Sequence, residues 1–210
     1  MGCKCKTVAV LGKGSQAVRV AQWFDDTPGW RLKYVVPVTP EPGWTKSLIV
    51  WVVDNSREAA LVTTHEAVPN VDLMFSCFYN KRIDRGTIAR QGMVLNLHNS
   101  LLPRHRGMNP INWALRNGER KHGVTIHKVT AEFDEGDILA QREFPISPEF
   151  DEVSDVYEIC LAHGYHQFCD TMHNLEQRWD NARRQDVSQA TYHTAADATH
   201  LGERSGWRRP

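Results

Sequence analysis

Residues 94–139 read VLNLHNSLLPRHRGMNPINWALRNGERKHGVTIHKVTAEFDEGDIL, and this stretch indicates both the fold and the chemistry of the chain. It begins within an apolar run, Met93 to Leu97, that is typical of a strand. Because alternate residues of a strand share a face, we expect Asn96 and His98 on one face. The turn that follows, Asn99 to Pro103, cannot continue a central strand, so both side chains are expected at its carboxyl end. Ligands bind at this edge of open α/β sheets.

The second half of the stretch predicts a helix, two strands and an acidic turn. A helix is expected to begin near Pro110, and alternating residues predict strands over 123–129 and 138–144. The acidic turn over residues 132–137 separates the two strands and carries Asp134. We therefore expect an amide, an imidazole and a carboxylate near one edge of a sheet.

These three groups suit direct acyl transfer to an amine. When an amine attacks a carbonyl carbon, negative charge develops on the oxygen, and an amide NH2 and an imidazole N–H can stabilise it. The attacking nitrogen must lose a proton, and the leaving nitrogen must gain one. A carboxylate beside the imidazole can relay that proton, directly or through a water, and can orient the ring. The reaction needs no covalent nucleophile.

The motif N-x-H-x-S-L-L-P-x-x-x-G from Asn96 to Gly107, with Asp134 in an F-D-E-G loop, resembles the 10-formyltetrahydrofolate-dependent formyltransferases. This family includes glycinamide ribonucleotide formyltransferase, methionyl-tRNA formyltransferase and the sugar N-formyltransferases. The resemblance covers residues 6–180. It implies a Rossmann-like α/β fold, with a mostly parallel central sheet flanked by helices, and N10-formyltetrahydrofolate as formyl donor. The catalytic residues that it implies are Asn96, His98 and Asp134.

The same resemblance implies where the two substrates bind. The loop after the buried strand predicted over residues 71–78 lies where the family binds the pterin ring, largely through backbone groups. For Lys81 and Arg82 the alternative is an ordinary solvated loop. The implied folate-binding residues are Tyr79, Asn80, Lys81, Arg82, Ile83 and Phe133. The implied acceptor-binding residues are Asn99, Ser100, Gly107 and Asn109.

The N-terminal part of the chain alternates strand and helix patterns. Strands are expected over residues 7–11 and 32–36, with an amphipathic helix over 16–24 between them. The glycine-rich turn at residues 12–15 either offers backbone N–H groups to an anion or is a tight turn that needs glycine. In the glycinamide ribonucleotide enzymes a similar loop holds the substrate phosphate, so the resemblance makes candidate phosphate contacts of Lys13 and Ser15.

The remaining segments predict helices and a tail. Residues 46–69 are expected to hold a helix and then a short strand with a following helix. Apolar residues at three-to-four spacing predict a long helix over residues 151–179, which Gly164 kinks or divides. We expect residues 1–180 to form one catalytic domain. Residues 181–210 are expected to be a tail that forms a small hairpin, makes a subunit contact or is disordered.

Charge and cysteine content bear on the class of protein. The chain has 25 basic and 25 acidic residues, so nothing in it indicates binding to nucleic acid or to an anionic membrane. It has neither a run that could span a bilayer nor an N-terminal signal peptide, so a cytoplasmic location is expected. Five scattered cysteines are expected to be free thiols. Cys3-x-Cys5 lacks a second ligand pair, and packing or capping is expected of His163, His166 and His173, so no metal is expected.

The length and the local motifs of the chain bear on the identity of the acceptor amine. Methionyl-tRNA is disfavoured, because 210 residues leave no room for an additional tRNA-binding domain and the chain has no basic surplus. Glycinamide ribonucleotide fits the length and the turn at residues 12–15. The segment RGMNPINW, residues 106–113, looks more like the sugar N-formyltransferases, so we expect a dTDP- or UDP-linked amino sugar as acceptor, with a homodimer left open. Two alternatives are a 10-formyltetrahydrofolate hydrolase and a catalytically silent folate-binding protein.

Overall fold

Strand β1 (Lys6–Gly12) lies at the middle of a run of five parallel strands, in the order β3-β2-β1-β4-β5. The computed structural model describes residues 5–201, which divide into two compact units. The first unit holds residues 5–97 and 128–131, and the second holds the remainder. The parallel strands and their helices confirm the expected Rossmann-like α/β fold.

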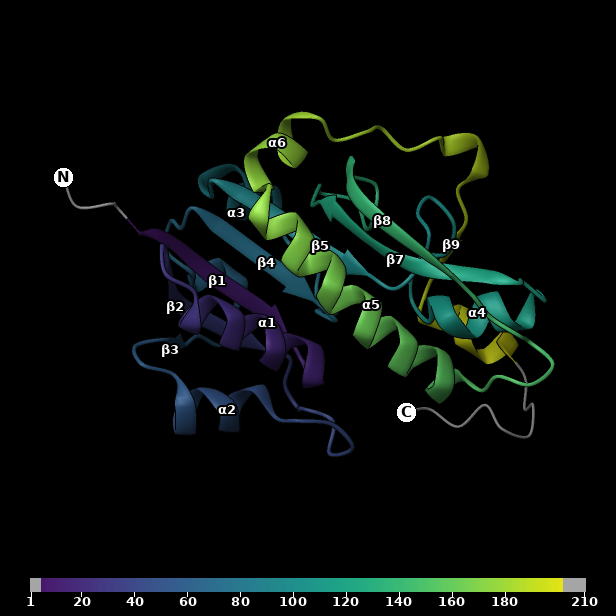
Figure 1. Ribbon diagram of the computed structural model, residues 1–210, viewed down its shortest axis with the longest axis horizontal. Coiled ribbons are helices and arrows are strands. Elements are labelled where there is room, and N and C mark those ends of the chain that lie inside the picture. The colour runs from purple at the N-terminus through teal and green to yellow at the C-terminus, as the bar shows by residue number, and fades with distance from the viewer. Residues whose placement is uncertain (1–4, 202–210) are drawn as a thin grey trace. The chain divides into compact units, whose positions relative to one another are not determined.

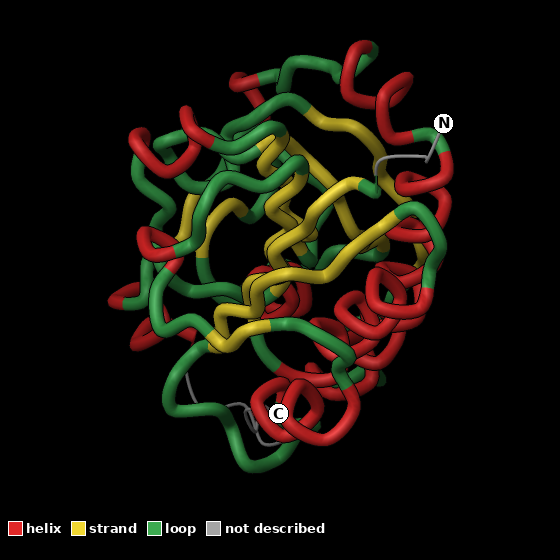
Figure 2. The backbone as a smooth tube through the Cα atoms, turned by 90° about the vertical axis from the view of Figure 1, so that its left-hand side faces the viewer, coloured by secondary structure: helices red, strands yellow, loops and turns green. Residues whose placement is uncertain are grey.

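The first unit alternates strands and helices along the chain. Its other strands are β2 (Trp30–Pro37), β3 (Ala60–Leu61), β4 (Leu73–Cys77) and β5 (Met93–His98). Its helices are α1 (Gly14–Asp26), α2 (Leu48–Asn55) and α3 (Arg85–Arg90), with a short 3-10 helix η1 (His65–Ala67). Figure 1 shows β1, β4 and β5 side by side, and Figure 2 draws the strands yellow and the helices red.

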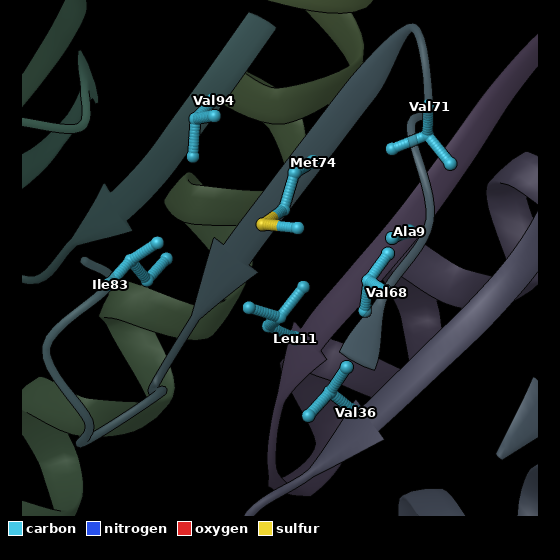
Figure 3. Close-up of a cluster of buried hydrophobic side chains, with 8 residues drawn as sticks. All are labelled: Ala9, Leu11, Val36, Val68, Val71, Met74, Ile83 and Val94. Carbon is cyan, nitrogen blue, oxygen red and sulfur yellow. The ribbon is translucent and has the colours of Figure 1, made fainter. Parts of the chain in front are cut away.

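The core of the first unit is built from the continuous apolar runs of its strands. All five residues of β4 are buried, as expected for a parallel strand that is covered on both faces. One cluster of buried side chains joins β1, β2, β4 and β5 (Figure 3): Ala9, Leu11, Val36, Val68, Val71, Met74, Ile83 and Val94. Burial of this apolar surface stabilises the register of the strands.

The predicted glycine-rich turn connects β1 to α1. Gly12 has a φ of +150°, and a Cβ there would lie 1.9 Å from the carbonyl oxygen of Cys77. Only glycine permits this close approach of two backbones. Helix α1 then buries the face predicted from the apolar spacing: Ala17, Val20, Ala21 and Phe24.

The second unit is built on an antiparallel hairpin of β7 (Lys121–Lys128) and β8 (Ile138–Pro145). Helix α5 (Val153–His173) packs on β8 and on α4 (Pro110–Arg116). Strand β6 (Arg106–Gly107) pairs in parallel with β9 (Tyr192–His193). The other elements are α6 (Leu175–Asp180) and two 3-10 helices, η2 (Val187–Gln189) and η3 (Ala196–Leu201).

Two details of the helices differ from the sequence prediction. The helix predicted over residues 151–179 is divided, but the division at Gly164 is wrong, because Gly164 lies buried within α5. The break falls at Asn174, whose φ of −129° and ψ of 33° leave the helical region between α5 and α6. Helix α3 has no counterpart among the predicted elements. Its signal is Asp84, an N-cap whose Oδ1 accepts a hydrogen bond from the Thr87 N–H at 2.9 Å.

The C-terminal segment is described as far as residue 201. Residues 181–201 include β9, which pairs with β6 inside the second unit. The division between a domain and a tail at residue 180 stays a prediction. Residues 202–210 lie outside the described part of the chain, as does Cys3 of the Cys-x-Cys pair.

The described residues also bear on the cysteines and on the helices. Cys5, Cys77, Cys160 and Cys169 are free thiols, as predicted. Among residues 5–201, no helix combines the length and the apolar character that crossing a membrane requires.

Candidate active site

His98 is the last residue of β5, and its side chain is buried. Its Nε2 lies 2.8 Å from the carbonyl oxygen of His105. Because a carbonyl oxygen only accepts, Nε2 carries the proton, and the neutral ring leaves Nδ1 as its basic nitrogen. The Ser100 hydroxyl ties the intervening turn by donating to the carbonyl oxygen of Arg104 at 2.7 Å. The local chain therefore sets the tautomer of His98.

Asp134 places its carboxylate against that basic nitrogen. Its Oδ2 lies 3.5 Å from Nδ1 of His98 and accepts a hydrogen bond from the Gly107 N–H at 2.8 Å. Its Oδ1 lies 3.3 Å from Nε2 of His127. Asp134 has a φ of +55°, which aspartate adopts more readily than most residues. The structure thus brings two of the three predicted catalytic residues together within the second unit.

Burial and charge act in opposite directions on this pair. Burial lowers the pKa of His98 below its usual value, although the Asp134 carboxylate raises it in part. Burial by itself would raise the pKa of Asp134, but the rings of His98 and His127 and the Gly107 N–H hold it well below its usual value. At neutral pH the pair is therefore a neutral imidazole beside a carboxylate, which is ready to accept a proton.

Asn96, the third predicted catalytic residue, lies two residues before His98 in β5. Its Oδ1 accepts a hydrogen bond from the Ser76 hydroxyl at 2.9 Å. This contact identifies Oδ1 as the acceptor end of the amide and orients the NH2 group as a donor. Ser76 stands opposite Asn96 in the pairing of β4 with β5, so the register of the sheet fixes the amide. An oriented amide donor is what oxyanion stabilisation requires.

The predicted folate loop follows β4 and lies outside helices and strands. Two of its side chains contact other residues of the first unit. Tyr79 is hydrogen-bonded to Nδ1 of His65 at 2.9 Å, and Ile83 belongs to the hydrophobic core. Burial raises the pKa of Tyr79 to about 12. Phe133 in the second unit is 38% exposed. The exposed residues of the loop are Asn80, Lys81 and Arg82.

The residues predicted to bind the acceptor amine lie in the turn after β5, in β6 and at the start of α4. Ser100 is fully buried in the turn after β5, and Gly107 donates to Asp134. Asn109 has a φ of +55° and stands at the start of α4. Asn99 is buried, and its Nδ2 has no hydrogen-bond partner among the described residues. Contacts of these residues with an acceptor stay a prediction.

Two further histidines, His105 and His127, lie beside the pair, and the residue types alone favour a structural role for both. His105 is fully buried, and its Nε2 lies 2.7 Å from Oε1 of Glu119, which fits that role. His127 contacts the carboxylate of Asp134 directly. Alternation along the sequence cannot orient His127, because the pairing of β7 with β8 shifts register between Ile126 and His127.

One group of described side chains has the spacing of metal ligands: atoms of His65, Glu66 and Asp84 lie within 4.8 Å of one another. The Asp84 carboxylate already caps helix α3. Lys81 and Arg90 also lie near enough to oppose a positive charge on His65. Helix capping and a buried histidine account for this group.

The fold and this site define an α/β protein with a buried imidazole beside a carboxylate at the end of a parallel strand. Residues 8–172 match the family model described as formyl transferase, and the chain belongs to the formyl transferase family. This confirms the family predicted from the motif around His98.

The curated relatives match part of this chain and are longer proteins. A methionyl-tRNA formyltransferase from Streptococcus gordonii is 34% identical over 129 residues, which are 60% of this chain and 41% of that protein. The bifunctional polymyxin resistance protein ArnA from Wigglesworthia glossinidia brevipalpis is 40% identical over 95 residues, 45% of this chain and 14% of that protein. The chain thus spans less than half the length of these relatives.

Solved structures include sugar-modifying members of the family. WlaRD, a sugar 3N-formyl transferase crystallised in the presence of dTDP and 5-N-formyl-THF, matches with a TM-score of 0.79 at 25% identity. The match covers 93% of this chain and 72% of WlaRD.

Proposed function

We propose that this protein transfers the formyl group of N10-formyltetrahydrofolate to a primary amine of a small molecule. The observation that carries the proposal is the buried contact between Nδ1 of His98 and the Asp134 carboxylate. The oriented amide of Asn96 lies two residues earlier in the same strand. Family membership and the match to a structure obtained with 5-N-formyl-THF support the donor.

The reaction is a direct transfer through a tetrahedral intermediate. The amine nitrogen forms a bond to the formyl carbon, and the charge that develops on the formyl oxygen is stabilised by the NH2 group of Asn96. The attacking nitrogen gives its proton to Nδ1 of His98, and Asp134 stabilises the resulting imidazolium. The bond between the formyl carbon and N10 then breaks, and the imidazolium of His98 gives its proton to N10 as tetrahydrofolate leaves, which restores the neutral ring.

The tautomer of His98 refines the role that the sequence suggests. In the neutral ring the only N–H is donated to the carbonyl oxygen of His105. His98 can therefore donate toward the formyl oxygen only after Nδ1 has accepted a proton. Early in the reaction the oxyanion depends on Asn96, and His98 acts first as the base.

Donor binding is assigned to the loop from Tyr79 to Ile83 and to Phe133. The loop lies outside helices and strands, and its middle residues are exposed, which fits recognition through backbone groups. The side chains of Tyr79 and Ile83 are held in the first unit, so they fix the course of the loop. Phe133 offers a partly exposed ring for packing against a ligand.

For the acceptor we propose a dTDP- or UDP-linked amino sugar, and the match to WlaRD supports this choice. Glycinamide ribonucleotide is the second candidate, through the turn at residues 12–15. One observation disfavours it: the Ser15 N–H donates to Oγ1 of Thr45 at 3.1 Å, so this group of the turn is already used within the chain. A hydrolase that uses water as acceptor is the third candidate.

The proposal can be tested by supplying the donor alone and then with candidate amines. We expect little tetrahydrofolate from 10-formyltetrahydrofolate alone, and rapid release with formylated product when a dTDP- or UDP-linked amino sugar is added. Mass spectrometry identifies the product, and His98→Asn is the inactive control. Release without any amine would identify a hydrolase. No release with any amine would contradict the proposed function.

The proposal includes a cytoplasmic location, where reducing conditions preserve the free thiols, and no nucleic-acid or membrane partner. A homodimer is a further part of the proposal. Light scattering of the purified protein would measure its mass in solution, and a monomer over the working concentration range would exclude the homodimer.

A further inference from the structure

We propose that Gln185 is a positioning residue that holds the His98–Asp134 pair in its working geometry. The inference rests on the proposed function, because it concerns the same pair. Gln185 lies beyond residues 8–172, the part of the chain that matches the family model. Gln185 therefore indicates that the C-terminal segment, which lies outside the family match, contributes to the geometry of the pair.

Gln185 uses both ends of its amide to join two segments. Its Oε1 accepts hydrogen bonds from the Arg106 guanidinium, at 3.1 Å from Nε and 2.8 Å from Nη2. Its Nε2 donates to the carbonyl oxygens of Asp134 and Gly136, both at 2.7 Å. One side chain thus ties the turn that carries Asp134 to strand β6.

These two segments are also the ones that hold the catalytic pair. The carbonyl oxygen of His105, just before β6, holds Nε2 of His98, and the N–H of Gly107 in β6 holds Oδ2 of Asp134. A shift of the acidic turn relative to β6 would move the carboxylate away from Nδ1 of His98.

The choice of a neutral amide suits the buried guanidinium of Arg106. Only 6% of Arg106 is exposed, and its Nη1 pairs with Oε1 of Glu135 at 3.1 Å. Gln185 satisfies two further N–H groups of this guanidinium without adding another negative charge to those of Asp134 and Glu135. The amide therefore leaves the Asp134 carboxylate as the charge that acts on His98.

The segment that carries this glutamine is anchored on both sides. Before it, Arg183 and Ile138 exchange two backbone hydrogen bonds, at 2.7 and 2.8 Å. After it, the Met108 N–H donates to the carbonyl oxygen of His193 at 2.8 Å. The His193 ring stacks on Trp113, with ring centroids 4.1 Å apart. These contacts hold the backbone in place, so the amide is presented in one orientation.

Three variants separate positioning from folding. Gln185→Met keeps the size of the side chain and removes both ends of the amide. Gln185→Glu keeps an acceptor for Arg106 but removes the donor to the acidic turn. Gln189→Met is the matched control, because Gln189 is exposed in the same segment and donates to Oδ2 of Asp186 at 2.9 Å.

We expect kcat to fall about 10- to 100-fold in Gln185→Met and Gln185→Glu, the range for residues that orient a catalytic group. KM for the folate donor should stay within about twofold, because the ground-state contacts are unchanged. Gln189→Met should behave like the wild type. Far-UV circular dichroism and an unfolding curve will show that each variant is folded at the assay temperature.

The decisive readout is the titration of the His98 ring, followed by NMR. The groups that face this ring are Asp134, His127, His105 and His122. If Gln185 positions Asp134, Gln185→Met will lower the pKa of His98, because the stabilising carboxylate moves away. In Gln185→Glu the new carboxylate acts on the ring in the opposite direction, so this variant is judged by its kcat. A role in folding alone would lower the unfolding midpoint and leave this titration unchanged.

The two proposals can fail separately. A wild-type titration of His98 together with a wild-type kcat in Gln185→Met would overturn the positioning role. If Gln185→Met does not fold, the kcat of Gln185→Glu decides the question, because a wild-type value in this variant would overturn the positioning role. If the wild-type protein transfers formyl groups to no amine, the proposed function fails, but the NMR titration still decides whether Gln185 positions the pair.

Discussion

The Nε2–H of His98 is donated to the carbonyl oxygen of His105, 2.8 Å away. This contact assigns the two nitrogens of the ring to different tasks. Nε2 anchors the ring to the turn, and Nδ1 faces the Asp134 carboxylate as the proton acceptor. The consequences for catalysis and for stability can be measured one at a time.

Asn96→Ala should lower kcat by about 10²-fold or more, because it removes the oriented donor to the developing oxyanion. Affinity for the folate donor should change little. Ser76→Ala is an informative companion, because it keeps the amide and removes the hydroxyl that orients it. We expect Ser76→Ala to lose less activity than Asn96→Ala in steady-state assays. Wild-type turnover in Asn96→Ala would contradict the assignment.

His98→Asn and Asp134→Asn should each lower kcat by roughly 10²-fold or more, the range for a general base and its partner. The double variant should be little worse than His98→Asn alone, because the two side chains act as one unit. The steady-state kcat values of the two single variants and the double variant, each compared with the wild type, give the coupling free energy between His98 and Asp134. Losses that multiply would mean that Asp134 acts independently of His98.

Buried neutral histidines should make the protein sensitive to acid. Burial lowers the pKa of His122 to about 4. In the unfolded chain this histidine binds a proton below about pH 6.5, whereas the folded protein resists protonation down to about pH 4. The unfolded state therefore binds more protons in this window, and the free energy of unfolding falls as the pH is lowered.

The contribution of His122 is on the order of 3 kcal/mol at full effect. Urea unfolding at pH 7 and at pH 4.5 measures it, and His122→Gln should reduce the loss of stability between the two. An unchanged pH dependence in this variant would show that other groups, such as His98, account for the acid sensitivity.

Gly107→Ala should lower the free energy of unfolding by more than the strain of a positive φ, because the new Cβ would also clash with a neighbouring carbonyl oxygen. Gly107 has a φ of +84°, and a Cβ there would lie 2.2 Å from the carbonyl oxygen of His193. Gly118 has a φ of +69° with no atom within 4 Å of such a Cβ, so Gly118→Ala is the matched control. We expect a loss of about 2 kcal/mol or more for Gly107→Ala and about 1 kcal/mol for Gly118→Ala, from urea unfolding. Equal losses would mean that β9 moves aside without cost.

Local sequence patterns predict most of the elements because their causes are local. The apolar run at residues 7–11, the glycine turn after it and the face of α1 depend on neighbours within a few residues. The same holds for β5 and the turn after His98. The break at Asn174 depends on the backbone angles of that residue, and the helix after Asp84 depends on its cap hydrogen bond, and the apolar spacing of the sequence shows neither.

For the candidate site, the sequence by itself determined which groups are available: an amide and an imidazole two residues apart in a strand, and an aspartate in a later acidic turn. The tertiary structure alone decided how they meet. The contact of His98 with Asp134 and the hydrogen bonds of the Gln185 amide depend on residues far apart in the chain. Hydrophobic periodicity and turn propensity are local quantities, and they hold no information about such contacts.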